Sequence, residues 1–295
     1  MGWIYLLIAV FCSSLLTIIF KYFQKYKIHT SSAIVFNYFA ASSLAFGFAH
    51  HSPSLSTYLS SNWAIPAVIL GILFITLFNV LAFASQNIGV AEANIANKTT
   101  FIFPALVGMI YFGELVNGAK IIGVLMAVAA IYYSAKDKQQ GEIHAGKAAG
   151  LIATLFVGGG MLDLLLSFTT EYWVEEHQVG LFTGYGFLMA AIFGTFNWLL
   201  QFFKGTAVLQ RKDIVGGLLL GIPNYFSIYF FLLALKSTDL ESSVVFPVIN
   251  MGVIIFASLF SWLLFGERIK RNKFLAISLA ILAIVLISWS DHFAF

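Results

Sequence analysis

Long apolar stretches alternate with short polar segments along the whole chain. Each stretch approaches the roughly 20 apolar residues that an α-helix needs to cross the hydrocarbon core of a bilayer. None shows the alternation of apolar and polar residues that marks a transmembrane β-strand. The polar segment from His50 to Asn62 is predicted to be a loop. The pattern predicts ten transmembrane helices, at approximately 2–21, 31–49, 64–86, 92–113, 118–135, 147–170, 179–203, 213–236, 241–265 and 271–290.

Composition agrees with this pattern, since 60% of the residues are apolar and 10% are charged, with a mean hydropathy of +0.91. A soluble domain carries about 25% charged residues. The first apolar run is too long for a signal peptide and has neither a basic segment before it nor a small-residue cleavage site after it. We therefore predict an all-α polytopic protein, multi-pass in the cell membrane, and we expect that membrane to be a bacterial inner membrane.

One short pattern occurs twice, 153 residues apart. Phe112-Gly113-Glu114 is followed by Lys120, and Phe265-Gly266-Glu267 is followed by Lys273. Two apolar halves can align by composition alone, but the shared spacing of four residue types favours a duplication. Further matches are Leu70-Gly71 with Leu220-Gly221, Ala84 with Ala234, and Gly123, Ala127 and Ala130 with Ala276, Ala280 and Ala283.

The duplication divides the chain into two repeats, residues 1–135 and 147–291, joined by a polar linker at 136–146. Because five helices per repeat is an odd number, the second copy enters the membrane upside down. Inverted repeats recur in secondary transporters, where the substrate site lies near the midplane between them. The sequence thus predicts ten helices arranged as two inverted five-helix repeats.

Basic residues predict which loops face the cytoplasm. Thirteen of the 16 lysine and arginine residues lie in or beside the loops that follow predicted helices 2–21, 118–135, 179–203 and 241–265. Cytoplasmic loops carry an excess of these residues. Those four loops are therefore predicted to be cytoplasmic, and both termini are predicted to face outward.

Two units of the chain share a common plan, one running from Ala84 to Glu114 and on from Lys120 to Tyr132, the other from Ala234 to Glu267. In each, an alanine-started turn leads to a helix that ends in Gly-Glu. This plan resembles the repeat of EamA-type transporters of the drug/metabolite transporter superfamily. The resemblance implies a ten-helix transporter of amino acids, sugars, nucleotide sugars, drugs or other metabolites. The chain departs from the family in Pro104, which stands later than the usual proline, and in the predicted outward termini.

Polar side chains inside a membrane span usually face a cavity or another helix. Lys98 shares a helix face with Asn94 and Asn97, where an ammonium would attract a carboxylate or phosphate of a substrate. The alternative is a lysine that snorkels to the cytoplasmic headgroups, but the asparagines would have no use facing lipid. Asn250 matches Asn97 in the second half, next to Pro247, which frees a backbone carbonyl for a ligand or only kinks the helix.

Other spans also carry polar faces that we include among the candidate substrate contacts. Any single asparagine among them is better explained by hydrogen bonding between helices, but together they indicate a polar central cavity. These candidates are Thr76 and Asn79, on a face shared with Phe83 and Gln86, then Asn224 and Tyr225 beside Tyr229, and Asn37 beside Tyr38.

Asp163 is the carboxylate that lies well inside a predicted span, after Gly158-Gly159-Gly160. It is a candidate for proton coupling, because burial favours the neutral form of a carboxyl group. The alternative is a structural pair with Lys98 or a hydroxyl. We expect Lys98 and Asp163 to lie in opposite halves of the bilayer, which leaves direct pairing open.

The repeated glutamates, Glu114 and Glu267, lie at helix ends that water can reach. We expect them to bind backbone donors at the start of the next helix, where the helix dipole favours an anion. Lys120 and Lys273 would then lie within the first turns of that next helix and snorkel to the surface.

An intramembrane enzyme is the main alternative from another class of protein. It would need a nucleophile–base pair or a metal cluster, yet the six histidines lie in or beside loops without a metal-ligand spacing, and no G-x-S-x-G motif occurs. A channel would show pore-lining rings of charge or filter loops, and the sequence shows neither. We predict no enzyme activity, catalytic residue, cofactor, metal or nucleic-acid partner.

The sequence predicts a secondary transporter of a small-molecule metabolite, an amino acid or a related solute, that works by alternating access. Export is the expected direction, with proton coupling through Asp163. Import of metabolites and export of amphipathic drugs are the alternatives. We expect a monomer or a weak homodimer in the lipid bilayer.

Overall fold

The computed structural model describes residues 2–49, 54–103, 118–136, 145–206, 208–236, 242–266 and 271–288, and within these ranges the secondary structure is entirely helical. The elements are α1 (Gly2–Lys25), α2 (Thr30–Phe48), α3 (Leu55–Ser60), α4 (Ala64–Asn87), α5 (Val90–Lys98), the 3₁₀ turn η1 (Thr99–Phe101), α7 (Gly118–Lys136), α8 (Ala145–Tyr172), the 3₁₀ turn η2 (Glu176–Gln178), α9 (Val179–Phe203), α10 (Arg211–Lys236), α11 (Ser242–Phe265) and α12 (Arg271–Ser288).

Six of these helices, α1, α2, α4, α8, α9 and α10, are long and apolar enough to cross a membrane. Two more, α7 and α11, contain the shorter apolar segments Ile121–Ala130 and Ile249–Phe265. The chain is therefore a multi-pass helical membrane protein. Most helices begin and end within a few residues of the predicted bounds, because the thickness of the hydrocarbon core sets the length of an apolar run.

The structure differs from the sequence prediction in two segments. The predicted loop from His50 to Asn62 contains the short helix α3, whose Leu55 and Leu59 are exposed. The span predicted at 92–113 begins as α5 but turns into η1 directly after Lys98. Phe112-Gly113-Glu114, Pro104 and Glu267 lie outside the described residues.

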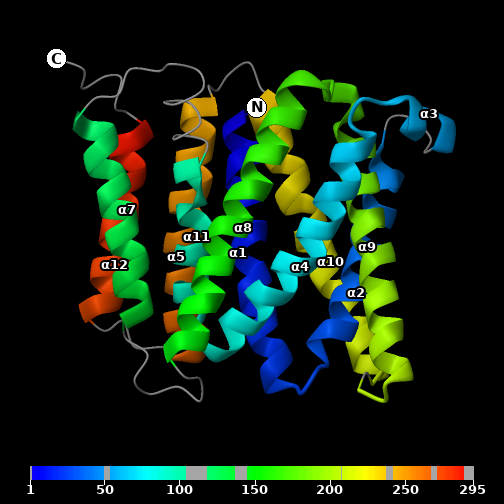
Figure 1. Cartoon of the computed structure of the whole chain (residues 1–295), viewed down its shortest axis with the longest axis horizontal. Coiled ribbons are helices and arrows are strands. Elements are labelled where there is room, and N and C mark those ends of the chain that lie inside the picture. Colours follow the sequence, from blue (N-terminus) through cyan, green and yellow to red (C-terminus); the bar gives the residue numbers. More distant parts are fainter. Residues whose placement is uncertain are drawn as a thin grey trace.

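The helices stand side by side as a bundle (Figure 1). α7 and α12 pack together at one edge, α2 and α9 pack together toward the other, and α1 and α8 lie between them. The start of α1 and the end of α12 lie at the same end of the bundle. The opposite end carries the end of α1 with Lys25, the end of α7 with Lys136, and the starts of α10 and α12 with Arg211 and Arg271. We call this opposite end the basic end.

Small residues let the helices approach closely. In a membrane, helices associate through close packing and polar contacts, because lipid tails are as apolar as leucine. A Cβ on Gly71 of α4 would lie 2.8 Å from the backbone nitrogen of Ala190 in α9, and one on Gly221 of α10 would lie 2.7 Å from the carbonyl oxygen of Asn37 in α2. Both glycines are therefore required by the crossing of two backbones.

The contact between α7 and α12 is built from alanines. Ala127 and Ala130 of α7 and Ala276, Ala280 and Ala283 of α12 are fully buried in one apolar cluster. The residues that match between the two repeats therefore pack against each other, because small side chains let two helices approach closely.

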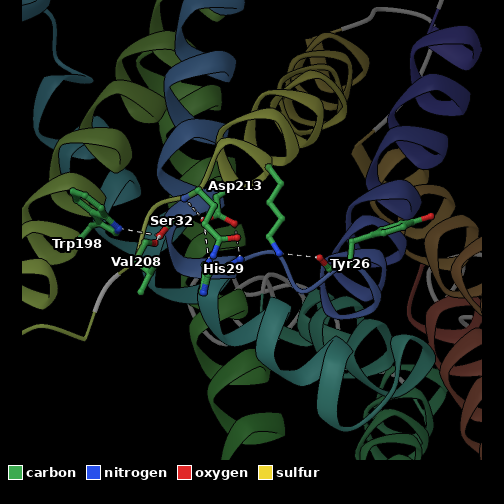
Figure 2. A network of polar contacts seen from close by, with 8 residues as sticks. Tyr26, His29, Ser32, Trp198, Val208 and Asp213 are labelled. Carbon is green, nitrogen blue, oxygen red and sulfur yellow. Dashed lines mark hydrogen bonds and ion pairs between the residues drawn. The ribbon is translucent and has the colours of Figure 1, made fainter.

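A polar network at the basic end joins the α1–α2 turn to the α9–α10 connection (Figure 2). Asp213, which is fully buried, accepts hydrogen bonds from the backbone nitrogens of His29 (2.8 Å) and Gln210 (2.8 Å), and its Oδ2 lies 3.0 Å from His29 Nδ1. Nearby, Trp198 donates to Ser32 Oγ, which in turn donates to the carbonyl oxygen of Val208. Two segments almost 200 residues apart in the sequence are thus fixed together.

Candidate functional site

A cavity lies between residues of the two halves of the chain. It contains about 980 Å³ of space not filled by atoms, counting the part that opens to solvent. Its lining residues come from α1, α2, α4 and α5 of the first half of the chain and from α8, α10 and α11 of the second half. The lining residues are Ser13, Leu16, Tyr38, Phe74, Leu77, Phe78, Leu81, Asn94, Asn97, Lys98, Gly159, Leu162, Asp163, Leu166, Asn224, Ser227, Ile228, Phe231, Ile249 and Asn250.

Three of the predicted residues come from α5. Asn94, Asn97 and Lys98 occupy one face of this helix and all reach the cavity. The amide of Asn94 is already used, since its Nδ2 donates to Thr17 Oγ1 (2.9 Å) and to the carbonyl oxygen of Val90 (2.8 Å). Asn94 therefore joins α5 to α1, while Asn97 and Lys98 remain at the cavity wall.

Lys98 and Asp163 line the same cavity, and Thr100, two residues after Lys98, contacts Asp163. The prediction that they lie in opposite halves of the bilayer is wrong. The first turn of α5 is buried inside the bundle, with Val90 and Ala91 fully inaccessible. Counting residues from the start of α5 therefore underestimates how far inside the bundle Lys98 lies.

Asp163 is held by a neighbour that the sequence did not single out. Thr100, in η1, donates a hydrogen bond from Oγ1 to Asp163 Oδ2. The same hydroxyl lies 3.0 Å from the carbonyl oxygen of Asn97. The predicted alternative of a contact between Asp163 and a hydroxyl is thus present, and it coexists with exposure of the carboxyl group to the cavity.

The three successive glycines of α8 bring this helix close to α4, α5 and η1. A Cβ on Gly158 would collide with Leu77, one on Gly159 would lie 2.8 Å from Thr100 Cγ2, and one on Gly160 would collide with Phe103. Without side chains at these positions, α8 can place Asp163 directly against Thr100.

The second half supplies two amide groups with unused donors. Asn224 of α10 and Asn250 of α11 line the cavity and are only 5% and 4% exposed. Within the described part of the chain, neither Nδ2 has a hydrogen-bond partner. A buried polar group without a partner is costly, so these two donors are suited to bind an acceptor on a ligand.

Four predicted residues do not line the cavity. Thr76 is exposed, and Asn79 donates to the carbonyl oxygen of Ile75 in its own helix (2.7 Å). Asn37 is fully buried where α2 crosses α10. Tyr225 stacks on Tyr229, with a distance of 5.2 Å between the two ring centroids.

The cavity face of α4 is apolar, contrary to the expectation of a polar face with Thr76 and Asn79. Phe74, Leu77, Phe78 and Leu81 form this face, at the i, i+3, i+4 and i+7 spacing of one helix side. Tyr38 also reaches the cavity, whereas its neighbour Asn37 does not. The helical spacing of these apolar residues was visible in the sequence, but nothing there separates a cavity wall from a lipid-facing or packed surface.

One lysine of the repeated motif is not at the surface. Lys273, in the first turn of α12, is only 6% exposed, and its Nζ lies 3.4 Å from Oε2 of Glu92 in the first turn of α5. The expectation that Lys273 snorkels is therefore wrong. Glu92 precedes Lys98 by six residues on α5, or about 9 Å along the helix axis, so the pair lies between the cavity and the basic end.

The fold and the cavity together define the class of protein, a multi-pass helical membrane protein whose halves share a polar, charged cavity suited to small solutes. The sequence matches the model of the EamA-like transporter family over residues 1–135 and 149–289. The chain belongs to this family, and membership implies a transporter of small solutes rather than an enzyme.

Two further similarities support the assignment of the fold. An uncharacterized protein of Haemophilus influenzae is 26% identical over 294 residues, which cover 97% of this chain and 98% of that protein. A solved crystal structure of a protein aligns with a TM-score of 0.66 at 14% identity, covering 97% of this chain and 96% of the other. At this identity the second similarity indicates a shared fold.

Proposed function

We propose that the protein is a secondary transporter that exports a small zwitterionic metabolite, an amino acid or a related solute, by alternating access. The observation that carries this proposal is the cavity in which Lys98 and Asp163 face the unpaired amide donors of Asn224 and Asn250. A ligand with both a carboxylate and an ammonium group would satisfy all four.

Charge complementarity favours this class of solute. The ammonium group of Lys98 and the amide donors suit a carboxylate, while the carboxyl group of Asp163 suits an ammonium group. Both charges lie in a low-dielectric interior where electrostatic interactions are stronger than in water. The apolar wall formed by Phe74, Phe78 and Phe231 provides a surface for an aliphatic or aromatic side chain.

The pattern of helix contacts supports two related halves, residues 1–135 and 147–291, joined by a linker at 136–146. If α1, α2, α4, α5 and α7 correspond to α8, α9, α10, α11 and α12, the most extensive contacts between non-corresponding helices of the two halves come in exchanged pairs. Thus α2–α10 corresponds to α9–α4, α1–α10 to α8–α4, and α1–α11 to α8–α5. Corresponding helices such as α1 and α8 run in opposite directions across the bundle (Figure 1), as an inverted repeat requires.

The distribution of charge supports an orientation with the basic end in the cytoplasm and both termini outside. We further propose that this membrane is a bacterial inner membrane. A cysteine introduced at Lys136, at the end of α7, should be protected from a membrane-impermeant thiol reagent in intact cells. Labelling from outside would reverse the proposed orientation and with it the direction of transport.

Transport in proteoliposomes tests the proposed function. Vesicles loaded with single amino acids should accumulate the same labelled amino acid by counterflow, and an imposed proton gradient should drive its accumulation. Lys98→Met and Asp163→Asn should each reduce this transport. The proposal is wrong if no amino acid shows counterflow, and the site is wrong if both variants transport like the wild type. Including amphipathic cations in the panel tests the alternative of drug export.

A further inference from the structure

The hydroxyl group of Thr100 has two acceptors but only one hydrogen. Its Oγ1 lies 2.5 Å from Asp163 Oδ2 and 3.0 Å from the carbonyl oxygen of Asn97. A threonine hydroxyl can donate one hydrogen bond and accept others, an ionised carboxylate can only accept, and a protonated carboxyl group can also donate. The protonation state of Asp163 therefore decides which way the hydroxyl hydrogen points.

With Asp163 ionised, Thr100 donates its hydrogen to the carboxylate, and the carbonyl oxygen of Asn97 loses this donor. When the carboxylate takes up a proton from cavity water, Oδ2–H can donate to Thr100 Oγ1. The hydroxyl hydrogen of Thr100 then turns to the Asn97 carbonyl. Both arrangements satisfy the groups that are most costly to leave unpaired, and they differ only in the direction of two hydrogen bonds.

The second acceptor lies at a break in a helix. Thr100 belongs to η1, where the α-helical geometry of α5 changes to a 3₁₀ turn directly after Lys98. Such mid-helix changes often mark hinges, because their hydrogen bonds are weaker than those of an α-helix. A hydrogen bond that Thr100 gives to or withholds from the Asn97 carbonyl therefore acts on the turn next to Asn97 and Lys98, which both line the cavity.

We propose that Thr100 is a positioning residue that transmits the protonation state of Asp163 on α8 to the α5–η1 junction, and so couples proton uptake to the position of Lys98. This inference rests on the proposed function, in which Asp163 couples protons to transport. Gly159 lets Thr100 lie directly against α8, because any side chain at this position would displace Thr100.

Of the ionisable groups on the described elements that pack against Asp163, Lys98 is the one that lines the cavity with it. The helix α4 and the turn η1 carry no ionisable side chain. On α5, Glu92 is paired with Lys273 instead. The remaining groups lie near helix ends: Lys120, Tyr132, Tyr133 and Lys136 on α7, and Lys147, Glu171 and Tyr172 on α8.

The substitution that isolates this role is Thr100→Val, which keeps the shape of the side chain and removes the hydroxyl. Thr100→Ser keeps the hydroxyl and should restore the wild-type behaviour. Thr99→Val is the matched control, because Thr99 is an equally buried neighbour in η1 whose hydroxyl bonds to the preceding turn, at the carbonyl oxygens of Ile95 (2.7 Å) and Ala96 (3.3 Å).

The first measurement needs no solute. Infrared difference spectra between acid and alkaline pH, recorded on the whole protein in lipid, should contain a carbonyl-stretch band of protonated Asp163 that Asp163→Asn removes. Thr100→Val should shift this band to higher wavenumber, because the carboxyl group loses its hydrogen-bond acceptor, while Thr100→Ser and Thr99→Val should leave it in place. Absence of an Asp163 band, or a band that Thr100→Val does not shift, overturns the inference.

The second measurement separates coupling from transport. A pH-sensitive dye inside proteoliposomes should report proton movement when an equimolar mixture of the protein amino acids is added. Thr100→Val should lower this solute-dependent proton flux about tenfold or more, the expected effect of losing a hydrogen bond to a charged group, while counterflow of the same mixture persists. Equal losses of flux and counterflow would show a merely structural role. Absence of counterflow in the wild type would instead refute the proposed function.

Discussion

Removal of the Asp213 carboxylate should destabilise the whole bundle, because this side chain joins its two halves at the basic end (Figure 2). An Asp213→Ala substitution deletes three contacts, with His29 N, His29 Nδ1 and Gln210 N. A hydrogen bond to a charged group contributes roughly 1.5–3 kcal/mol. Part of this sum offsets the cost of burying the carboxylate, and water can reach Gln210, which is exposed. We therefore expect a net loss of about 2–4 kcal/mol.

The only cysteine of the chain provides the assay. Cys12 is buried, so a dye that fluoresces on reaction with a thiol reports unfolding in detergent. At about 2–4 °C per kcal/mol for a chain of this size, Asp213→Ala should lower the melting temperature by about 4–16 °C.

Two graded variants test whether the carboxylate contacts are the cause. Asp213→Asn keeps Oδ1 as the acceptor for His29 N but loses the second oxygen, and should have an intermediate effect. His29→Ala removes only the contact of a ring that is 39% exposed, and should cost less than about 1 kcal/mol. The reasoning fails if Asp213→Ala melts with the wild type, or if His29→Ala is as destabilising as Asp213→Ala.

Two other sets of variants test the close approach of α8 and the buried ion pair beside the cavity. Gly159→Ala should destabilise the protein by about 1–3 kcal/mol through overpacking against Thr100 and should reduce transport. Gly150→Ala, in the same helix with open space around the added methyl group, should be neutral or stabilising. Equal effects of the two substitutions in thermal unfolding would contradict the close approach of α8. Glu92→Gln or Lys273→Met alone should cost up to about 3–5 kcal/mol, because each removes one side of a buried ion pair. The double variant should recover part of the loss, and additive losses in a double-mutant cycle would mean that the two side chains do not interact.

The positions of most helices followed from the sequence because bilayer thickness limits the length of an apolar run. The predicted span 179–203 coincides with α9, and 64–86 differs from α4 by one residue. The end of α5 at Lys98 was not predictable in the same way. The apolar run continues past this residue, and hydropathy does not distinguish an α-helix from a 3₁₀ turn.

The cavity was predicted in part, through its most costly side chains. Lys98, Asp163 and Asn250 reach it, since charged and amide groups inside a membrane need a partner or water. The face of α4 was assigned wrongly because its amide groups have partners outside the cavity: Asn79 bonds its own helix, and Gln86 donates to the carbonyl oxygen of Phe20 on α1 and to Thr30 on α2. Which side of a helix meets a cavity depends on its neighbours, and a single sequence does not specify them.

Neither charged group of the cavity, Lys98 in the first half or Asp163 in the second, has a charged counterpart among the residues that line the cavity. At the offset that matches Asn97 with Asn250, the position of Lys98 corresponds to Met251. The counterpart of α8 is α1, which lines the cavity with the uncharged Ser13 and Leu16. A solute bound by these groups has only one favourable orientation, although the surrounding scaffold repeats itself. It would therefore cross the membrane without turning over, with the same end of the molecule held by α5 and α8 whether the cavity opens to one side or the other.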